Sequence, residues 1–296
     1  MFEFVHNHIL RPLYPVPRAV LPRKTIFRLS HRYAKARFLN YLKKRLGPQW
    51  VETNIDDGSA MSKRLRLLTR SLDEAAYHAE FSDDQFFYES YCQAYYFFRL
   101  MEPLGFNLRT CGSILDFGCG SARILRLYRY IDGVYLVGSD VHPECIEWCI
   151  ENVPGPEFYV NQAEPPLLFS KDNQFSFVIS LSVFNHIPLN QQTAWLEEMK
   201  RVLRPGGFLL CTTLGRSYDR VLGPGGHQLI REQKEVQIEM NDERAALSTR
   251  AGGASHDIYQ RRDRVIDVFG SVLRLRDYIP DAWSPIGQDV LILQKP

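Results

Sequence analysis

The region from Cys111 to Thr213 alternates short apolar runs with amphipathic segments, and this alternation constrains the fold more than any other feature of the chain. Short apolar runs bounded by glycine or proline are typical of buried strands. Strands that alternate with helices predict a parallel sheet covered by helices on both faces. We expect strands at Ser113–Phe117, Val134–Ser139, Glu157–Val160, Phe175–Leu181 and Gly207–Thr213, and helices at Ser121–Tyr130, Pro143–Asn152 and Asn190–Leu203.

The C-terminal part departs from this pattern. The segments VLRLRDYIP and GQDVLILQK each alternate apolar and polar residues, and a short loop separates them. This arrangement predicts an antiparallel pair at one edge of the sheet. Residues 216–258 are polar, contain several glycines and are too long for an ordinary connection, so we expect an insertion that bears function. The predicted fold class is α/β, with a mainly parallel sheet and a reversed edge strand.

The N-terminal part is strongly basic. Residues 1–50 contain eleven Lys or Arg against one acid, Glu3, which gives +10 and leaves −8 on the rest of a chain whose net charge is +2. We expect a helix at 25–46 and treat residues 1–85 as a helical extension and linker that precedes a domain at 86–296. A solvated helix laid against the acidic domain is one interpretation. The others are a grip on an anionic membrane surface or on nucleic acid.

Composition excludes several classes of protein. The chain is 45% hydrophobic and 12% aromatic, as expected for a globular protein with a sizeable core. It has no apolar run of about 18 residues, which argues against a membrane span, and no pattern of a secretory signal at its N-terminus. Its six cysteines follow no disulfide framework, so we expect reduced thiols and a cytoplasmic protein, with attachment to the inner membrane surface as the alternative.

Two cysteines lie one helical turn apart. Cys145 and Cys149 follow His142, which suggests a metal site when read alone. No fourth ligand has suitable spacing, and cysteines at positions i and i+4 of a helix usually face a core. We therefore expect no metal.

The first crossover carries three small residues spaced two apart, namely Gly118, Gly120 and Ala122. A glycine turn between a strand and a helix directs unpaired amides at whatever lies above the sheet, so it indicates a nucleotide-type site. The dehydrogenase fingerprint G-x-G-x-x-G requires a final glycine, and GCGSAR has Arg123 there. We therefore disfavour a dinucleotide-dependent dehydrogenase.

Over roughly residues 86–296 the chain resembles the class I S-adenosylmethionine-dependent methyltransferases. LDFGCGSA resembles the first motif of that family, VGSD its second strand with a terminal acid, and NQAEPPLLF the loop after its third strand. FSFVISLSVFNHIP resembles the fourth strand with its active-site edge, and WLEEMKRVLRPGGFLLCTT the next helix and the fifth strand. The resemblance implies a Rossmann-like, doubly wound domain with S-adenosylmethionine as cofactor, and with residues 216–258 on the substrate side.

The resemblance also implies a cofactor site. The glycines would let the backbone approach the methionine and ribose parts, and Asp140 would accept the ribose hydroxyls. Asp116 would brace the turn or touch the amino group, Val141 would pack on adenine, and Gln162 and Ala163 would bond its edge. The residues expected at the cofactor are Asp116, Gly118, Cys119, Gly120, Asp140, Val141, Gln162, Ala163 and Ser180.

Methyl transfer to a hydroxyl requires an aligned acceptor and a place for its proton. His186 follows the fourth strand, where the methyl group should project, and a neutral imidazole is a suitable base. The alternative is a histidine that only shapes the loop. His227 and His256, in or beside the insertion, are further candidates.

Several segments, among them GCGSARILR and GQDVLIL, resemble a bacterial group often found near glycan and natural-product genes. That group tends to have a histidine where Leu214 stands, so no role is carried over to this position. We expect methyl transfer to a hydroxyl, and less to an amine, of a small molecule or sugar. The alternatives are a nucleic-acid methyltransferase that grips through residues 1–50 and a catalytically silent cofactor-binding partner protein.

Overall fold

The structure is a computed structural model, and it describes residues 97, 100–107, 110–128, 133–214, 235–239, 256–283 and 288–296. The basic segment 1–50, the rest of the expected extension and His227 lie outside the described residues. The elements in chain order are η3 (Glu102–Leu104), β1 (Ser113–Phe117), α7 (Leu125–Tyr128), β2 (Tyr135–Asp140), α8 (Pro143–Asn152), β3 (Glu157–Val160), β4 (Phe175–Ser180), α9 (Leu189–Val202), β5 (Leu203–Thr213), β6 (Glu235–Glu239), β7 (His256–Gln260), α13 (Arg262–Val272), β8 (Arg274–Trp283) and β9 (Gln288–Gln294).

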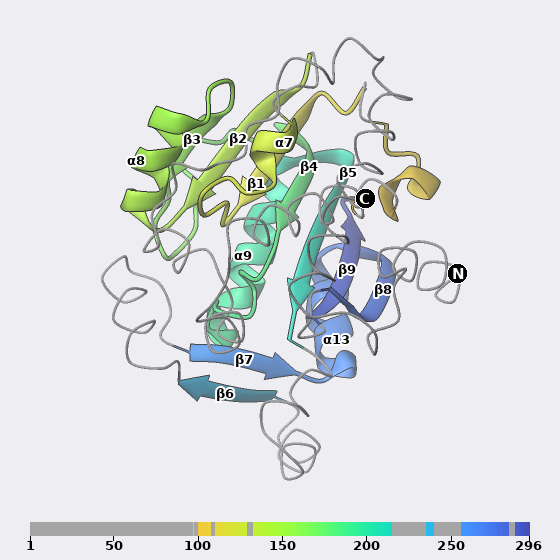
Figure 1. Cartoon of the computed structure of the whole chain (residues 1–296). Helices are drawn as coiled ribbons and strands as arrows, with labels where there is room; N and C mark the ends of the chain where they lie inside the picture. The colour runs from red at the N-terminus through yellow and green to blue at the C-terminus, as the bar shows by residue number, and fades with distance from the viewer. Residues whose placement is uncertain are drawn as a thin grey trace, which may run out of the picture.

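The main sheet has seven strands in the order β3-β2-β1-β4-β5-β9-β8 (Figure 1). The strands from β3 to β5 are parallel, whereas β9 is antiparallel to both of its neighbours. Strand order reverses between β1 and β4, which is the point where open α/β sheets bind ligands at the carboxyl ends of their strands. The predicted doubly wound α/β fold with a reversed edge strand is confirmed.

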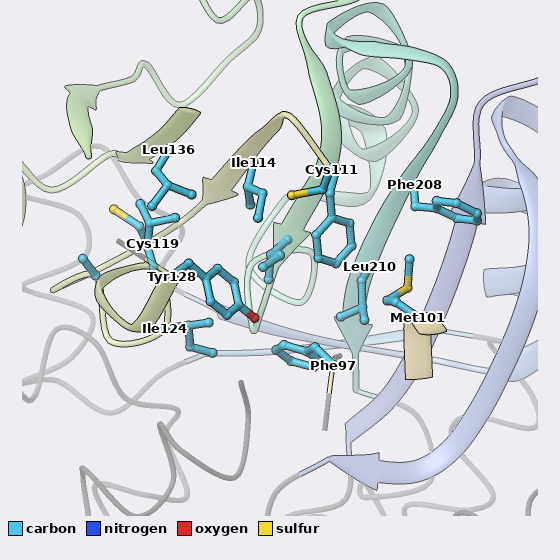
Figure 2. Packing of buried hydrophobic residues seen from close by; sticks show 14 of the residues in the cluster. Phe97, Met101, Cys111, Ile114, Cys119, Ile124, Tyr128, Leu136, Phe208 and Leu210 are labelled. Atoms are coloured by element: carbon cyan, nitrogen blue, oxygen red, sulfur yellow. The ribbon is translucent and has the colours of Figure 1, made fainter. Parts of the chain in front are cut away.

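Side chains alternate between two cores, one on each face of the sheet. On one face, Ile114 and Phe177 pack with residues of α7 and α8 and with Phe97 and Met101. Figure 2 shows Phe97 and Met101 lying against Leu210 and Phe208 on that face. On the other face, Leu115 and Val178 pack with α9 and α13. Burial of each large apolar side chain contributes about 1.5–3 kcal/mol, so both faces stabilise the sheet that holds the site.

The structure corrects several expected boundaries. The sequence predicts the first helix from Ser121, but the helix begins at Leu125 because residues 121–124 form turns and Ala122 has a left-handed φ of 54°. The sequence predicts the fifth strand from Gly207, but the strand begins at Leu203, which pairs with Phe175 before an irregularity in the register. The preceding helix ends at Val202, one residue before the expected end.

The insertion contributes a second, two-stranded sheet. Strands β6 and β7 pair antiparallel from Glu235↔Gln260 to Glu239↔His256. Strand β7 is tied to the main sheet because the Gln260 amide donates to the carbonyl oxygen of Leu214 at 3.0 Å, and it lies across the end of β5 in Figure 1. The described part of the insertion therefore adjoins the edge where the parallel strands end. Among the described residues, no helix is long and apolar enough to cross a membrane.

Candidate cofactor and acceptor site

The glycine turn after β1 is held against the end of β2. The amides of Gly118 and Cys119 donate to the carbonyl oxygen of Ser139 at 2.8 and 2.9 Å. Gly118 has a φ of 77°, and a Cβ built on it would lie 2.2 Å from Cγ2 of Val183. Glycine is needed here both for the backbone conformation and for the approach of Val183. The contact that excludes a side chain is thus one within the protein.

Asp140 ends β2 and is oriented by two backbone amides. Its Oδ2 accepts from the Gly120 amide at 2.8 Å, and its Oδ1 accepts from the His142 amide at 3.0 Å. A carboxylate offers about four acceptor positions, so each oxygen can still accept another hydrogen bond. Both oxygens are therefore fixed in place with capacity to hold a vicinal diol such as a ribose. The binding of a ribose by Asp140 stays a prediction.

Asp116 lies beside Asp140 in the interior. Burial, and then the charge of Asp140, raise the pKa of Asp116 to about 7, while Arg123 and the Leu125 amide act in the opposite direction. A carboxyl group with this pKa changes charge near neutral pH. A cationic ligand group placed near it would favour its ionised form.

Cysteine thiols back the glycine turn. Cys119 and Cys149 both direct their sulfur atoms to the carbonyl oxygen of Gly120, at 3.6 and 3.4 Å. Burial raises the pKa of the Cys119 thiol well above its usual value, and burial also raises the pKa of Cys145. The thiols of Cys119 and Cys145 therefore stay protonated and act as packing groups. Cys145 and Cys149 are both fully buried, which confirms that they face the core.

The loop after β3 is anchored by α9. The Trp195 indole nitrogen donates to the carbonyl oxygen of Ala163 at 3.3 Å, and a Glu198 carboxylate oxygen accepts from the Leu167 amide at 2.7 Å. Gln162 and Ala163 themselves are exposed. The helix thus sets the path of this loop while leaving its expected ligand-binding residues accessible. The sequence motifs did not indicate this role of Trp195 in anchoring the loop.

Val141 and Ser180 complete the expected cofactor residues. Val141 follows Asp140 directly and is half-buried. Ser180 ends β4 and is fully buried, and its hydroxyl has no hydrogen-bond partner among the described residues. A buried hydroxyl without a partner is uncommon and requires an explanation. Because β4 pairs with β1 up to Asp116↔Ile179, Ser180 stands beside the start of the glycine turn.

His186 lies in the loop after β4. It is half-buried, and its Nε2 lies 3.1 Å from the side-chain nitrogen of Asn185, which donates a hydrogen bond to Nε2 in the tautomer that leaves Nε2 unprotonated. The neighbouring carbonyl oxygen in this loop, that of Asn185, accepts from the Ile258 amide of β7 at 2.8 Å. His256 begins the same strand. The structure therefore places the backbones of two of the three candidate histidines at one edge of the sheet.

Polar residues that the motifs did not indicate hold this edge together. Thr212 Oγ1 accepts from the Ser182 amide at 2.8 Å, and the Gln288 side-chain nitrogen donates to Ser182 Oγ at 2.8 Å. The side chain of Gln192 donates to the carbonyl oxygen of Phe184 at 3.0 Å and accepts from Gln260 at 3.1 Å. The sequence feature that could have indicated such residues is a polar residue at the end of an otherwise apolar strand, as in GQDVLIL.

Comparison with known proteins agrees with this geometry. Residues 115–211 match a family described as a methyltransferase domain. The chain is similar to a tRNA (carboxymethyluridine(34)-5-O)-methyltransferase of Arabidopsis thaliana, at 32% identity over 107 residues, 36% of this chain and 25% of that protein. The chain thus aligns with about a quarter of the length of that relative.

Solved structures share the fold. Magnesium protoporphyrin IX methyltransferase from Synechocystis PCC 6803, with bound SAH, superposes with a TM-score of 0.51 at 12% identity, over 79% of this chain and 93% of that one. The structure of a putative S-adenosylmethionine-dependent methyltransferase from Listeria monocytogenes superposes with a TM-score of 0.50 at 11% identity. The match covers 66% of this chain and 97% of that one. Residues 115–211 thus match a methyltransferase domain, and the chain shares its fold with solved methyltransferases.

Proposed function

We propose that the protein transfers a methyl group from S-adenosylmethionine to a hydroxyl group of a small molecule or a sugar. The observation that carries this proposal is the arrangement at the carboxyl edge of the sheet. The oriented carboxylate of Asp140 stands on one side of the glycine turn, and the loop bearing His186 contacts that turn from the other side through Val183. The two halves of a transfer site therefore adjoin at the turn.

On the cofactor side, the residues that would hold S-adenosylmethionine are those of the turn, Asp140, and the loop at Gln162 and Ala163. Asp140 would accept the ribose hydroxyls, and ionised Asp116 would favour a nearby positive charge. When bound, the cofactor supplies a methyl carbon that its sulfonium makes electrophilic. The chain must then orient a nucleophile toward that carbon and exclude water.

On the acceptor side, we assign His186 the removal of the hydroxyl proton. A base for this step should have a pKa near the working pH, as an ordinary imidazole has. The surrounding groups support an uncharged acceptor, since Ser182, Asn185 and Gln288 are all neutral hydrogen-bonding residues. Hydroxyl groups of a sugar or similar molecule match this set. An amine acceptor is the less favoured form of the same proposal.

A nucleic-acid acceptor is the second candidate. The Arabidopsis relative is named for its own activity on tRNA, and residues 1–50 of this chain carry eleven basic residues against one acid. Basic arms supply sequence-independent affinity for phosphates, and that affinity falls steeply with salt.

Five of the cysteines are free and buried, which supports the proposal that the reaction takes place in the cytoplasm.

A labelled-methyl transfer assay tests both candidates. The full-length chain is incubated with methyl-labelled S-adenosylmethionine and separate pools of sugars, phenolic compounds and tRNA. We expect label in the sugar or phenolic pool, and we expect clearly less label with Asp140→Ala at a cofactor concentration near the wild-type Kd. Label only in tRNA, lost on raising the salt, would replace the first candidate with the second. Cofactor binding without label in any pool would favour a silent partner protein.

A further inference from the structure

The loop after β4 turns on a residue with an uncommon backbone conformation. Ser182 has a φ of 54°, in the left-handed region that residues other than glycine seldom adopt. Such conformations persist only where the surrounding structure enforces them, and they are concentrated at functional sites. Neighbouring groups must therefore enforce the conformation of Ser182, and we expect this conformation to serve a function.

The cause lies in two buried residues from distant strands. Thr212 of β5 accepts the Ser182 amide at 2.8 Å, and Gln288 of β9 exchanges hydrogen bonds with the Ser182 hydroxyl at 2.8 and 3.0 Å. Thr212 is 0% exposed and Gln288 is 1% exposed. Hydrogen bonds in such surroundings are costly to break because the abandoned group has no water to turn to. The two strands thus hold Ser182 by its backbone and by its side chain.

The consequence is that one turn reaches three parts of the site. The residue after Ser182 is Val183, whose Cγ2 occupies the space that a Cβ at Gly118 would need. The carbonyl oxygen of Val183 accepts the His186 amide at 2.8 Å, and that of Asn185 accepts the Ile258 amide of β7 at 2.8 Å. The cofactor turn, the candidate base and the insertion strand are therefore joined through the loop of residues 181–187.

We infer that Ser182 and Thr212 are positioning residues that couple the cofactor site to the acceptor site. They hold loop 181–187 in the form that rests on Gly118, so that filling the cofactor site stabilises the loop and, through Asn185, strand β7. Neither residue needs to touch a reacting atom. A coupling free energy of this kind is reciprocal between two sites. The inference rests on the proposed function, because it assigns β7 to the acceptor side.

Hydrogen exchange of the full chain with and without S-adenosylhomocysteine tests the coupling. We expect this ligand to slow exchange in loop 181–187 and also in β7, residues 256–260. In Thr212→Val the loop loses its acceptor, so protection of β7 by the ligand should disappear and the Kd for S-adenosylhomocysteine should rise about threefold to tenfold. Thr212→Ser keeps the hydroxyl and should restore both. Ser182→Gly keeps the backbone bond and should lie between wild type and Thr212→Val.

The outcomes separate the coupling from the function. Ligand binding to wild type with no protection of β7, or equal protection in wild type and Thr212→Val, would overturn the coupling and leave the methyltransferase assignment intact. Equal losses in Thr212→Val and Thr212→Ser would assign the effect to packing and also overturn it. If Thr212→Val does not fold, Val183→Ala breaks the same path at Gly118, and it should likewise abolish protection of β7. No binding to wild type would contradict the proposed function itself.

Discussion

On the cofactor side, Asp140 bonds amides two and twenty positions away in the sequence, whereas on the acceptor side Ser182 bonds Gln288, 106 positions away. On the first side, the glycine turn, the two carboxylates and the amides that bond Asp140 lie within β1, β2 and the short segments that join and follow them. The second side is built from side chains of several strands and an insertion. A local site is fixed by short loops, whereas the acceptor side requires the whole sheet to be assembled. Cofactor binding can therefore persist among chains whose acceptors differ.

The largest expected effect is that of a histidine on turnover, because this residue acts on the acceptor side alone. His186→Ala should lower turnover by about 10²–10⁴-fold and leave the Kd for S-adenosylmethionine unchanged, because the base acts only on the acceptor. Single-turnover rates with the acceptor found by the labelled-methyl assay measure it. His142→Ala is the matched control, since this half-buried histidine lies on the cofactor side. A His186→Ala protein that melts as wild type does and keeps its full rate would exclude His186 as the base.

The next effect tests the contact at which the two sides meet. Gly118→Ala should destabilise the fold by about 2–4 kcal/mol, because a left-handed alanine is strained and its Cβ overlaps Val183. Gly133 is a matched control, since its φ of 76° is nearly the same but no described residue lies within 4 Å of its Cβ position. Gly133→Ala should therefore cost about 1–2 kcal/mol. Urea unfolding measures both values.

The double variant Gly118→Ala with Val183→Ala sharpens this test. If the overlap with Val183 is the main cost, the second substitution should recover about 1–2 kcal/mol of the loss. Recovery would show that Gly118 serves the contact between the two sides as well as the turn. Equal stabilities of the single and double variants would contradict that role and leave Gly118 a residue of the turn alone.

The third effect is confined to the cofactor side. Asp140→Ala should weaken S-adenosylmethionine binding by about 1–3 kcal/mol, since hydrogen bonds to a charged acceptor are lost. Calorimetric titration gives the Kd. Asp140→Asn keeps the shape but replaces one acceptor oxygen by a donor, so it should also bind more weakly than wild type. Unchanged affinity in both variants would mean that Asp140 orients the turn without touching the ligand.

The same contrast explains what could be predicted from the sequence. The bounds of β1, β3 and α8 were predicted to the residue, because periodicity, proline and glycine are local signals. The start of α7 was not predicted correctly, because Ala122 adopts a left-handed backbone conformation that an alanine in the sequence does not indicate. Asp140 and the glycine turn stood out by their spacing. Thr212 and Gln288 did not, because their role depends on strands that become neighbours only in the folded sheet.

The smallest effect concerns the charge of Asp116. Burial and Asp140 raise its pKa from about 3.8 to about 7, so the native state keeps a proton that the unfolded chain releases. Wild-type stability should therefore fall as the pH rises from about 4 to about 7, and it should level off above that window. Asp116→Asn cannot ionise, so its stability relative to wild type should rise across the same window.

We expect that gain to reach about 1–2 kcal/mol at pH 8, below the limit set by the full shift because relaxation and water penetration reduce the cost of a buried charge. Chemical unfolding at pH 5, 6, 7 and 8 measures it, and Asp267→Asn, which removes an exposed carboxylate of α13, controls for net charge. A constant difference between Asp116→Asn and wild type at all four values would contradict a buried carboxyl that titrates near neutrality. Saturating S-adenosylmethionine should shrink the difference at pH 8, because a bound cation stabilises ionised Asp116, whereas the neutral amide of the Asp116→Asn variant offers the cation no charge. If the cofactor stabilises both proteins equally, Asp116 only braces the turn, and the cofactor side binds its ligand through Asp140 without help from the second carboxylate.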